Sequence, residues 1–187
     1  MTATDDVRAR LVRAVRQLGA VADRVVLAGG CAPAAWKLSA VAGDVRPTED
    51  IDLIVETSSL KEYYEIARAA GLSPHEDVAN PGPLCRHVVA GMLIDLMPTD
   101  PRVLGFANTW YPLAFATAER RELAPGATIR VITPILFIAT KLEALASRGG
   151  GDYQASQDFE DIVTAFVGVP GLAWTLRTGR DDVHEFI

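Results

Sequence analysis

Cysteine and long hydrophobic runs are both scarce in this sequence, and their absence excludes several classes of protein. Two cysteines, Cys31 and Cys85, make neither a disulfide framework nor a zinc site, so a reducing cytosol is the expected compartment. No apolar run approaches the roughly 20 residues that span a bilayer, and the charged first residues lack the apolar core of a signal peptide. We therefore expect a cytoplasmic protein that does not associate with a membrane.

A strongly positive charge is also missing. The chain carries a net charge of −6, which argues against a surface that coats nucleic acid. Arginines nevertheless crowd two places, and a solvated surface is the simplest interpretation of both. These arginines are Arg8, Arg10, Arg13, Arg16 and Arg24 near the start, and Arg120 and Arg121 further on. The histidines His75, His87 and His184 show no metal-ligand spacing.

Length and composition predict one folded domain. The chain has 187 residues, of which 49% are hydrophobic and 22% are charged, and this is enough to bury a core without disulfides or metals. We expect a single domain over residues 1–187, with a core at about 20–133 and a helical part at about 134–187.

Strands and helices are both predicted, without strict alternation. Apolar, β-branched runs bounded by turn residues predict strands at 25–28, 50–56, 87–90, 92–97, 120–123 and 129–132. Apolar periodicity and capping residues predict helices at 7–18, 32–38, 59–70, 134–148 and 156–167, with a short helix after 171. Residues 42–49 and 98–112 are expected to be irregular. This order predicts an α/β (α+β) fold, with a mixed sheet and flanking helices.

Two aspartates share one side of a predicted strand. Successive side chains in a strand point to opposite faces, so Asp50 and Asp52 project to the same side. Two carboxylates this close repel each other unless a cation lies between them. Magnesium takes oxygen ligands and keeps positions for substrate phosphates, so the pair predicts a metal and phosphate site. A strand edge with two solvated acids is the alternative.

A glycine pair and a third acid extend this pattern. Gly29-Gly30 lies between a predicted strand and a predicted helix, where missing Cβ atoms allow a phosphate to approach the backbone. A turn that requires positive φ is the other explanation. Asp95 stands among apolar residues of a strand, which is costly unless the carboxylate is paired or bound to metal. Beside two metal ions, a third carboxylate also serves as the base for an attacking hydroxyl.

The order of these residues resembles the DNA polymerase β-like nucleotidyltransferase pattern, in which a Gly-Gly turn precedes Asp-x-Asp and a third strand aspartate. Two longer strings resemble the AbiEii/AbiGii nucleotidyltransferase toxins, the group that includes the MenT-type toxins. The strings are Arg46-x-Thr48-x-Asp50-Ile51-Asp52, and Lys141-Leu142-Glu143-Ala144 followed by Arg148 and Asp158-x-x-Asp161. The resemblance covers residues 25 to about 165.

The resemblance implies a polymerase β-like nucleotidyltransferase core, two magnesium ions, and transfer of a nucleotide from a triphosphate such as ATP. It further implies an RNA acceptor, expected to be transfer RNA, and a toxin that a cognate antitoxin restrains. Carried over by position, Asp50, Asp52 and Asp95 would bind metal. The other residues implied at the site are Gly29, Gly30, Arg46, Thr48 and Lys141 around the triphosphate, with Asp158 or Asp161 in support. Longer members carry an extensive helical C-terminal region, whereas the sequence here ends soon after the helix that contains Asp158.

Several alternatives stay open at this point. Lys141 interrupts an apolar helix face, where its ammonium either reaches water or meets an anion. Asp158 and Asp161 share a helix face, and Asp158 also suits the first-turn helix dipole. The acceptor could instead be a small molecule, such as an aminoglycoside, or a protein hydroxyl, and the negative net charge suits a cationic compound. A non-catalytic domain that binds nucleotide or a protein partner is the remaining alternative.

Overall fold

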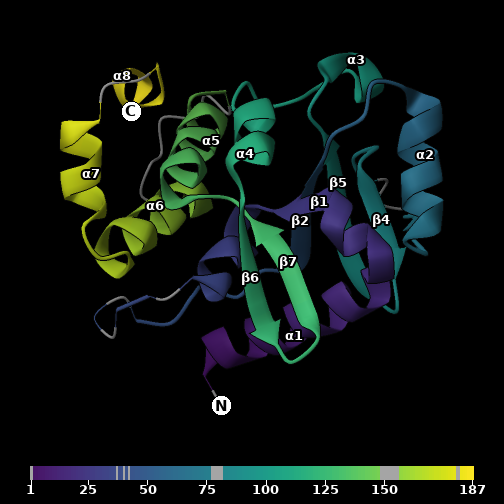
Figure 1. Cartoon of the computed structure of the whole chain (residues 1–187), viewed down its shortest axis with the longest axis horizontal. Coiled ribbons are helices and arrows are strands. Elements are labelled where there is room, and N and C mark those ends of the chain that lie inside the picture. Colours follow the sequence, from purple (N-terminus) through teal and green to yellow (C-terminus); the bar gives the residue numbers. More distant parts are fainter. Residues whose placement is uncertain are drawn as a thin grey trace.

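A mixed sheet of seven strands runs through the described part of the chain (Figure 1). The structure is a computed structural model that describes residues 2–36, 38–39, 41, 43–76, 82–147, 156–179 and 182–187. The strands are β1 Val25–Leu27, β2 Asp50–Val55, β3 Ser73–Pro74, β4 Arg86–Val89, β5 Met92–Pro98, β6 Glu119–Ala124 and β7 Ala127–Val131. Their order is β3-β4-β5-β2-β1-β7-β6. The predicted α/β class with a mixed sheet is confirmed.

The centre of the sheet contains two parallel pairs of strands. β2 pairs with β5 in parallel, and β1 pairs with β7 in parallel, whereas β1 and β2 are antiparallel. One face of β2 is apolar because Ile51 and Leu53 are buried at 1% and 0% exposure. Because side chains alternate along the strand, Asp50 and Asp52 lie on the other face, as predicted, and both are partly accessible.

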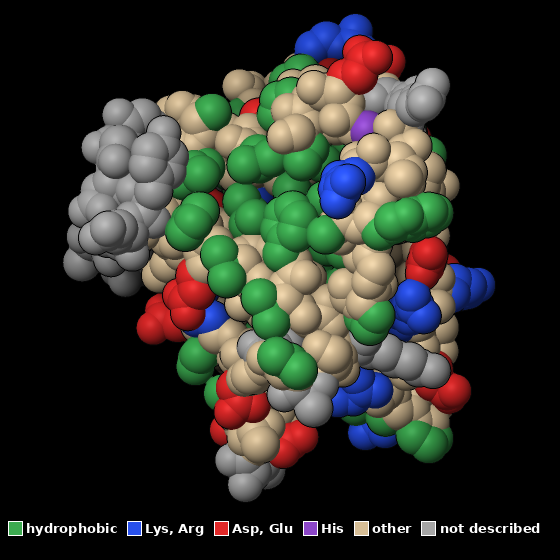
Figure 2. All heavy atoms as spheres, turned by 90° about the vertical axis from the view of Figure 1, so that its left-hand side faces the viewer, with side chains coloured by type: hydrophobic (Ala, Val, Ile, Leu, Met, Phe, Trp, Pro, Cys, Tyr) green, Lys and Arg blue, Asp and Glu red, His purple; other side chains and the backbone are tan. Residues whose placement is uncertain are grey.

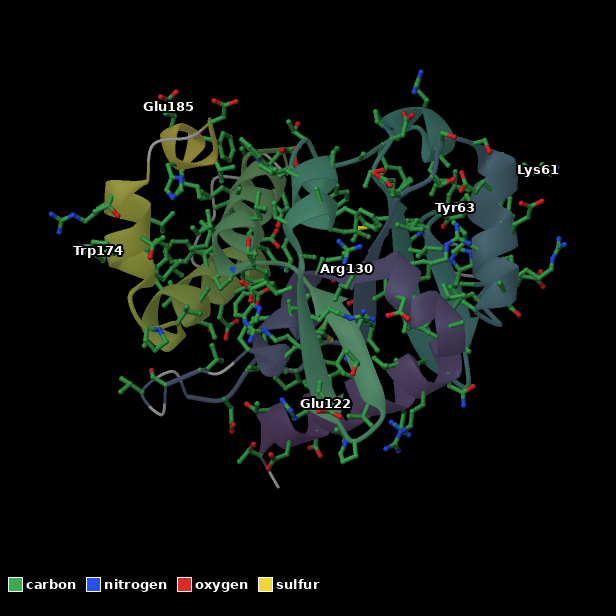
Figure 3. The ribbon with its side chains drawn as sticks, viewed as in Figure 1. Lys61, Tyr63, Glu122, Arg130, Trp174 and Glu185 are labelled. Atoms are coloured by element: carbon green, nitrogen blue, oxygen red, sulfur yellow. The ribbon has the colours of Figure 1, made fainter. Side chains whose placement is uncertain are left out.

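Helices of the N-terminal half cover the sheet. They are α1 Ala3–Leu18 and α2 Leu60–Ala69, with 3-10 helices at Gly19–Arg24 and Gly29–Ala35. Helix α1 starts with a capping box between Thr2 and Asp5, and it packs against β6 and β7. Helix α2 is amphipathic, since Tyr63 points inward and donates a hydrogen bond to the Leu96 carbonyl, whereas Lys61 points to solvent (Figure 3).

The two predicted hairpins are confirmed, and their turns explain their glycines. β4 and β5 are joined by Ala90 and Gly91, both with positive φ, which is the geometry of a two-residue type I′ connection. β6 and β7 are joined at Pro125 and Gly126, and Gly126 has φ +72°. The first turn fixes the register of β4 on β5, so that Arg86 lies opposite Asp95.

The C-terminal helices form a group beside the sheet (Figure 1). They are α5 Pro134–Ser147, α6 Gln157–Gly168, α7 Leu172–Thr178 and α8 Asp182–Phe186. Thr133-Pro134 and the Ser156 cap begin α5 and α6 as predicted. The predicted end of α5 at Arg148 and Gly149–Gly151 lies outside the described residues. Trp36 ties this group to the sheet, because its ring meets Phe137 edge-on at 5.1 Å and its Nε1 donates to the Ile132 carbonyl.

Exposed apolar side chains gather on this side of the molecule (Figure 2). They include Phe159, Val163 and Phe166 on α6 and Trp174 on α7, whose exposed fraction is 70%. Within the described ranges, no single helix is long and apolar enough to cross a membrane. Helices α6 and α7 satisfy such a test only together, by length and composition, and they are bent by 97° at their junction.

Two local predictions differ from the structure. The helix predicted at 32–38 is instead the 3-10 helix Gly29–Ala35, in which Pro33 removes a backbone donor. The stretch 98–112 is not wholly irregular, because it contains α3 Pro101–Leu104 and the start of α4 Tyr111–Thr117. Both helices carry a proline in their first turn, which is a favourable position for proline. The same prolines give these segments the composition of a loop.

Candidate active site

Asp50, Asp52 and Asp95, called here the acidic trio, meet on one face of the sheet. Asp52 lies directly opposite Asp95 in the parallel register of β2 and β5, and Asp50 lies two residues earlier on β2. Neighbouring residues in a strand register project their side chains to the same face. The structure therefore brings together the three acids that the sequence pattern singled out.

Arg86 lies between two members of the acidic trio. Its Nε and Nη2 donate to Asp95 Oδ1 and Oδ2 at 2.8 and 2.7 Å, and Nη2 also donates to Asp50 Oδ2 at 2.8 Å. The hydrogen bonds from Arg86 to Asp95 raise the pKa of the guanidinium against the opposing effect of burial. Arg86 is thus a fixed positive charge in the centre of the cluster.

Asp52 is the member of the acidic trio that lacks a partner. Its carboxylate makes no hydrogen bond or ion pair with the described residues. Burial raises the pKa of Asp52 to about 7, and repulsion from Asp50 adds to the increase, although Lys141 opposes it. A carboxylate with this pKa loses its proton readily when a cation arrives.

Gly29 lies against the unpaired carboxylate, and only a glycine fits there. A Cβ at Gly29 would be 1.6 Å from Asp52 Oδ2, and the backbone has φ +56°. The positive φ confirms the explanation of a turn that requires glycine, and the close approach of Asp52 is a second reason why a Cβ is absent. The approach of a phosphate to this backbone stays a prediction. The 3-10 helix that starts at Gly29 directs the following residues away from β1.

Gly30 opens a second close approach, toward Arg46, Thr48 and Asp161. A Cβ there would lie 3.1 Å from Arg46 Nη2, 3.4 Å from Asp161 Oδ2 and 3.7 Å from Thr48 Cβ. Thr48 in turn donates its hydroxyl to Asp50 Oδ1 at 3.0 Å. The loop before β2 is thereby linked to the first aspartate of the trio, and the glycine pair lies between that loop and Asp52.

Lys141, Asp158, Asp161 and Arg46 form a second charged group, called here the Lys141 cluster. Lys141 Nζ lies 3.0 Å from Asp158 Oδ1 and 2.7 Å from Asp161 Oδ2, and Arg46 Nε lies 3.5 Å from Asp161 Oδ1. Asp158 and Asp161 are buried at 4% and 3% exposure. Burial lowers the pKa of Lys141, but Asp161 and Asp158 outweigh it and leave the pKa raised. The anion that Lys141 meets in this structure is therefore a pair of aspartates.

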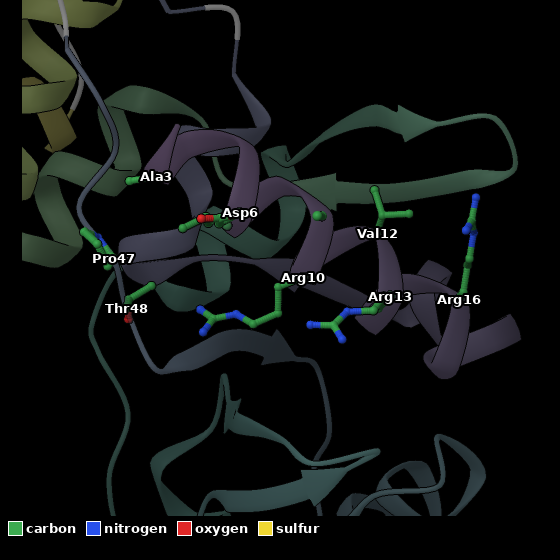
Figure 4. Close-up of a pocket in the computed structure, with 10 residues that line it drawn as sticks. Ala3, Asp6, Arg10, Val12, Arg13, Arg16, Pro47 and Thr48 are labelled. Carbon is green, nitrogen blue, oxygen red and sulfur yellow. The ribbon is translucent and has the colours of Figure 1, made fainter. Parts of the chain in front are cut away.

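A groove on α1 adjoins the acidic trio through Thr48. The groove has a volume of about 660 Å³ and is lined by Arg10, Arg13 and Arg16 on α1 and by Pro47 and Thr48 at one end (Figure 4). We call it the arginine groove. Arg8 is turned elsewhere, since it donates to the carbonyls of Ala34 and Leu123. Arg13 and Arg16 are exposed, whereas Arg10 is half-buried.

The donors of the acidic trio fit a divalent metal ion in kind. Carboxylate oxygens are the ligands that magnesium takes, and the Asp52 carboxylate makes no hydrogen bond or ion pair in the part of the chain that the structure describes. As the side chains lie, no three His, Cys, Asp or Glu residues in the described ranges are placed to hold one ion together. The positive charge between Asp50 and Asp95 is supplied by Arg86 instead.

Comparison with solved structures identifies the architecture. An antigenic nucleotidyltransferase-like protein from Paracoccidioides brasiliensis superposes with a TM-score of 0.53 at 17% identity, over 86% of this chain and 75% of that one. The chain has the nucleotidyltransferase fold. The antibiotic-resistance factor ANT(2'')-Ia, solved in solution, superposes with a TM-score of 0.52 at 15% identity, over 95% of this chain and 89% of that one. No protein-family model and no curated protein matches the sequence.

The nucleotidyltransferase fold brings together all of the residues that the sequence pattern selected, but sequence analysis missed Arg86. The signal for it was present, because the Ala90-Gly91 turn sets a register in which Arg86 and Asp95 are partners. A hairpin with a two-residue turn allows such partners to be counted from the turn outward. The family resemblance named Lys141, Arg46, Asp158 and Asp161 as site residues, but it did not predict the ion pairs among them.

Proposed function

We propose that this chain is a magnesium-dependent nucleotidyltransferase that moves a nucleoside monophosphate from a nucleoside triphosphate to an acceptor hydroxyl. The observation that carries the proposal is the acidic trio on two parallel strands, with the unpaired Asp52 beside the Gly29 turn. A domain that only bound nucleotide would have no need to gather three repelling carboxylates. The nucleotidyltransferase fold supports the same conclusion.

In this proposal, each group of residues has one task. Asp50, Asp52 and Asp95 hold two magnesium ions, which would supply charge stabilisation at the reacting phosphate. Gly29 and Gly30 let the triphosphate approach the backbone. The acceptor oxygen forms a bond to the α-phosphorus, the bond from that phosphorus to the bridging oxygen breaks, and pyrophosphate leaves. Asp95 helps to take the proton of the acceptor hydroxyl.

The Lys141 cluster would serve the triphosphate from the other side. Lys141 brings positive charge near Asp52, as its lowering effect on the Asp52 pKa indicates, and Arg46 adds a second cation at Asp161. Asp161 touches both cations and Asp158 touches Lys141, so we assign the two aspartates to positioning rather than to contact with substrate. Thr48 would orient Asp50 through its hydroxyl.

The acceptor that we propose is RNA, with transfer RNA as the first candidate. The resemblance to AbiEii/AbiGii toxins motivates the acceptor, and the arginine groove offers a basic path that ends at Thr48 beside Asp50. The same resemblance motivates a role as the toxin of a toxin–antitoxin pair. Exposed apolar side chains on α6 and α7 provide a surface that an antitoxin protein would bury.

A small-molecule acceptor is the second candidate, and two observations favour it. The chain carries a net charge of −6, which attracts a cationic hydroxyl compound and repels a polyanion at long range. One structural neighbour is described as an antibiotic-resistance factor. Transfer to a protein hydroxyl would use the same site and the same reaction.

Labelled triphosphates test these alternatives directly. The protein is incubated with magnesium, each of the four labelled triphosphates and total RNA, and the RNA is separated by electrophoresis. Label in a discrete RNA band supports the RNA acceptor. Label found by mass spectrometry only on an aminoglycoside or on protein supports the second candidate. Absence of pyrophosphate release with every acceptor and triphosphate would contradict the proposed reaction.

A further inference from the structure

We propose that Arg86 is a built-in counter-ion which holds the acidic trio in the absence of metal and which the metal–triphosphate complex displaces. The proposal rests on the proposed function, because it assigns metal binding to the acidic trio. Arg86 belongs to neither of the motifs that carry the family resemblance, and its assignment comes from its contacts. It acts on the reaction as a positioning residue.

Hydrogen-bond occupancy is the first step of the argument. Arg86 engages both oxygens of Asp95 and one oxygen of Asp50, while the Thr48 hydroxyl engages the other oxygen of Asp50. Only Asp52 is free of such contacts among the described residues. A metal ion shared by the trio would need carboxylate oxygens to which the guanidinium is now hydrogen-bonded. At least one hydrogen bond of Arg86 therefore has to break when the metal binds.

Charge is the second step. Three carboxylates and one guanidinium leave the cluster negative, so it attracts a further cation. Two divalent ions together with Arg86 would reverse the sign, and a positive guanidinium would then be repelled. A triphosphate restores the balance and offers phosphate oxygens to the guanidinium. Metal binding is therefore expected to be weak alone and strong with triphosphate, and the coupling is reciprocal.

The side chain of Arg86 is built for a limited movement. Gly82 packs against its stem, since a Cβ there would lie 2.9 Å from Arg86 Cδ. The Arg86 side chain is 24% exposed, so its guanidinium has access to solvent. Rotation about the last bonds of the side chain would break the contact with Asp50 without displacing β4.

The test is a titration with Mn²⁺, which takes the same oxygen ligands as magnesium and whose free ion is measured by electron paramagnetic resonance. Wild type, Arg86→Gln and Arg86→Lys are titrated without nucleotide and again with a non-hydrolysable triphosphate. We expect Arg86→Gln to bind Mn²⁺ alone about tenfold or more tightly than wild type, the factor that one lost charge-assisted contact provides. Arg86→Lys keeps the charge without the bidentate fork and should lie between them.

Arg102→Gln is the matched control, because Arg102 also forms an ion pair with a nearby aspartate, Asp100, but is 86% exposed and outside the acidic trio. It should leave Mn²⁺ affinity unchanged. The factor by which triphosphate increases the Mn²⁺ affinity should be smaller in Arg86→Gln than in wild type. Equal or weaker Mn²⁺ binding by Arg86→Gln would overturn the proposal.

Folding of the variants is read in the same series from melting temperatures with and without Mn²⁺. If Arg86→Gln is unfolded without metal, we expect Mn²⁺ to restore its folding. Failure of Mn²⁺ to restore the fold, together with an unchanged Mn²⁺ affinity of Arg86→Lys, would overturn the counter-ion role. Wild type that binds no Mn²⁺ even with triphosphate would contradict the proposed function itself. Wild type that binds Mn²⁺ and transfers nucleotide, beside an Arg86→Gln that gains nothing, would remove only this inference.

Discussion

The acidic trio and the Lys141 cluster are both groups of aspartates with basic partners, yet their charge balance is opposite. The trio has three carboxylates for one guanidinium, and Asp52 has no hydrogen-bond or ion-pair partner among the described residues. In the Lys141 cluster, two cations meet two buried aspartates at 2.7 to 3.5 Å. The first group is incomplete without a further cation, and the second is complete within the chain.

This difference indicates what each group does. A balanced, buried group of ion pairs holds α5 against α6, and the folded protein is destabilised when one partner is removed. A group with excess negative charge costs stability and is retained for binding. We therefore expect substitutions in the acidic trio to remove activity without harming the fold, and substitutions in the Lys141 cluster to harm both.

The largest expected effect is that of Asp52→Asn on activity. Loss of the unpaired carboxylate should lower nucleotidyl transfer by about a thousandfold or more, because metal-held charge stabilisation is worth several kcal/mol in the transition state. Transfer is measured as pyrophosphate release, with Asp23→Asn as a control at an exposed carboxylate. Full turnover of Asp52→Asn in magnesium would exclude the metal role of Asp52.

The same variant has a pH-dependent stability of predictable sign. The pKa of Asp52 rises to about 7 in the folded chain from an ordinary value of 3.8. The stability that this carboxyl contributes is complete below its unfolded pKa and is lost as the pH rises through the folded pKa. Without metal, the melting temperature of Asp52→Asn relative to wild type should therefore increase from pH 5 to pH 8. A constant difference would contradict the raised pKa.

The next largest effect concerns Lys141→Ala, which should lower both stability and activity. Removing Lys141 takes one cation away from the buried Asp158 and Asp161, so the free energy of unfolding should fall by about 3 kcal/mol. Lys141→Arg should recover part of the activity, because a planar fork replaces a compact charge poorly.

Lys61→Ala is the matched control for that variant. Lys61 pairs with Glu65 on the surface of α2 and is 86% exposed, so its loss should change the unfolding free energy by less than about 0.5 kcal/mol. Denaturant unfolding measures both variants. A Lys141→Ala protein as stable as Lys61→Ala would show that the cluster does not stabilise the fold.

A glycine comparison separates backbone strain from contact with the acidic trio. Gly29 and Gly126 both have positive φ, but a Cβ at Gly126 meets nothing within 4 Å, whereas at Gly29 it would overlap Asp52. Alanine at Gly126 should cost about 1–2 kcal/mol of stability, the usual penalty for left-handed backbone. Gly29→Ala should cost more and should also reduce transfer. Equal activity in the two variants would place Gly29 outside the site.

Most of the fold was predictable from the sequence because its signals are local. Alternation in β2, the Thr133-Pro134 helix start and the Ala90-Gly91 turn each depend on a few neighbouring residues. The 3-10 helix at Gly29–Ala35 was taken for an α-helix because composition does not distinguish the two. α4 was missed because its first turn carries Pro112 and aromatic residues that suggest a loop.

Most members of the candidate site were predictable, but Arg86 and the ion pairs were not. Strand alternation predicted the shared face of Asp50 and Asp52, whereas the family resemblance named Lys141 and Asp161 without predicting their contact. The contacts of Arg86 with Asp50 depend on β4, β5 and β2 lying side by side, which is a property of the sheet order. The preference of Lys141 for two aspartates depends likewise on how α5 packs on α6.

The smallest expected effect tests the arginine groove as the path of an RNA acceptor. Arg10 and Arg13 line the groove near Thr48, so Arg10→Glu with Arg13→Glu should weaken RNA labelling several-fold while leaving triphosphate binding unchanged. A matched double reversal at the exposed Arg102 and Arg177 changes the net charge equally outside the groove. Each phosphate contact contributes a slope of roughly 0.7–0.9 to the dependence of log affinity on log salt.

A chain with a net charge of −6 gains only local contacts with a polyanion, so the wild-type slope should be modest. The groove variant should reduce that slope by about 1 to 2, because two phosphate contacts are lost. The control pair should lower affinity slightly through net charge and leave the slope intact. Equal salt slopes and equal RNA labelling in the two double variants would exclude the groove as the RNA path. Labelling of a cationic small molecule by wild type and by both double variants would favour the small-molecule acceptor.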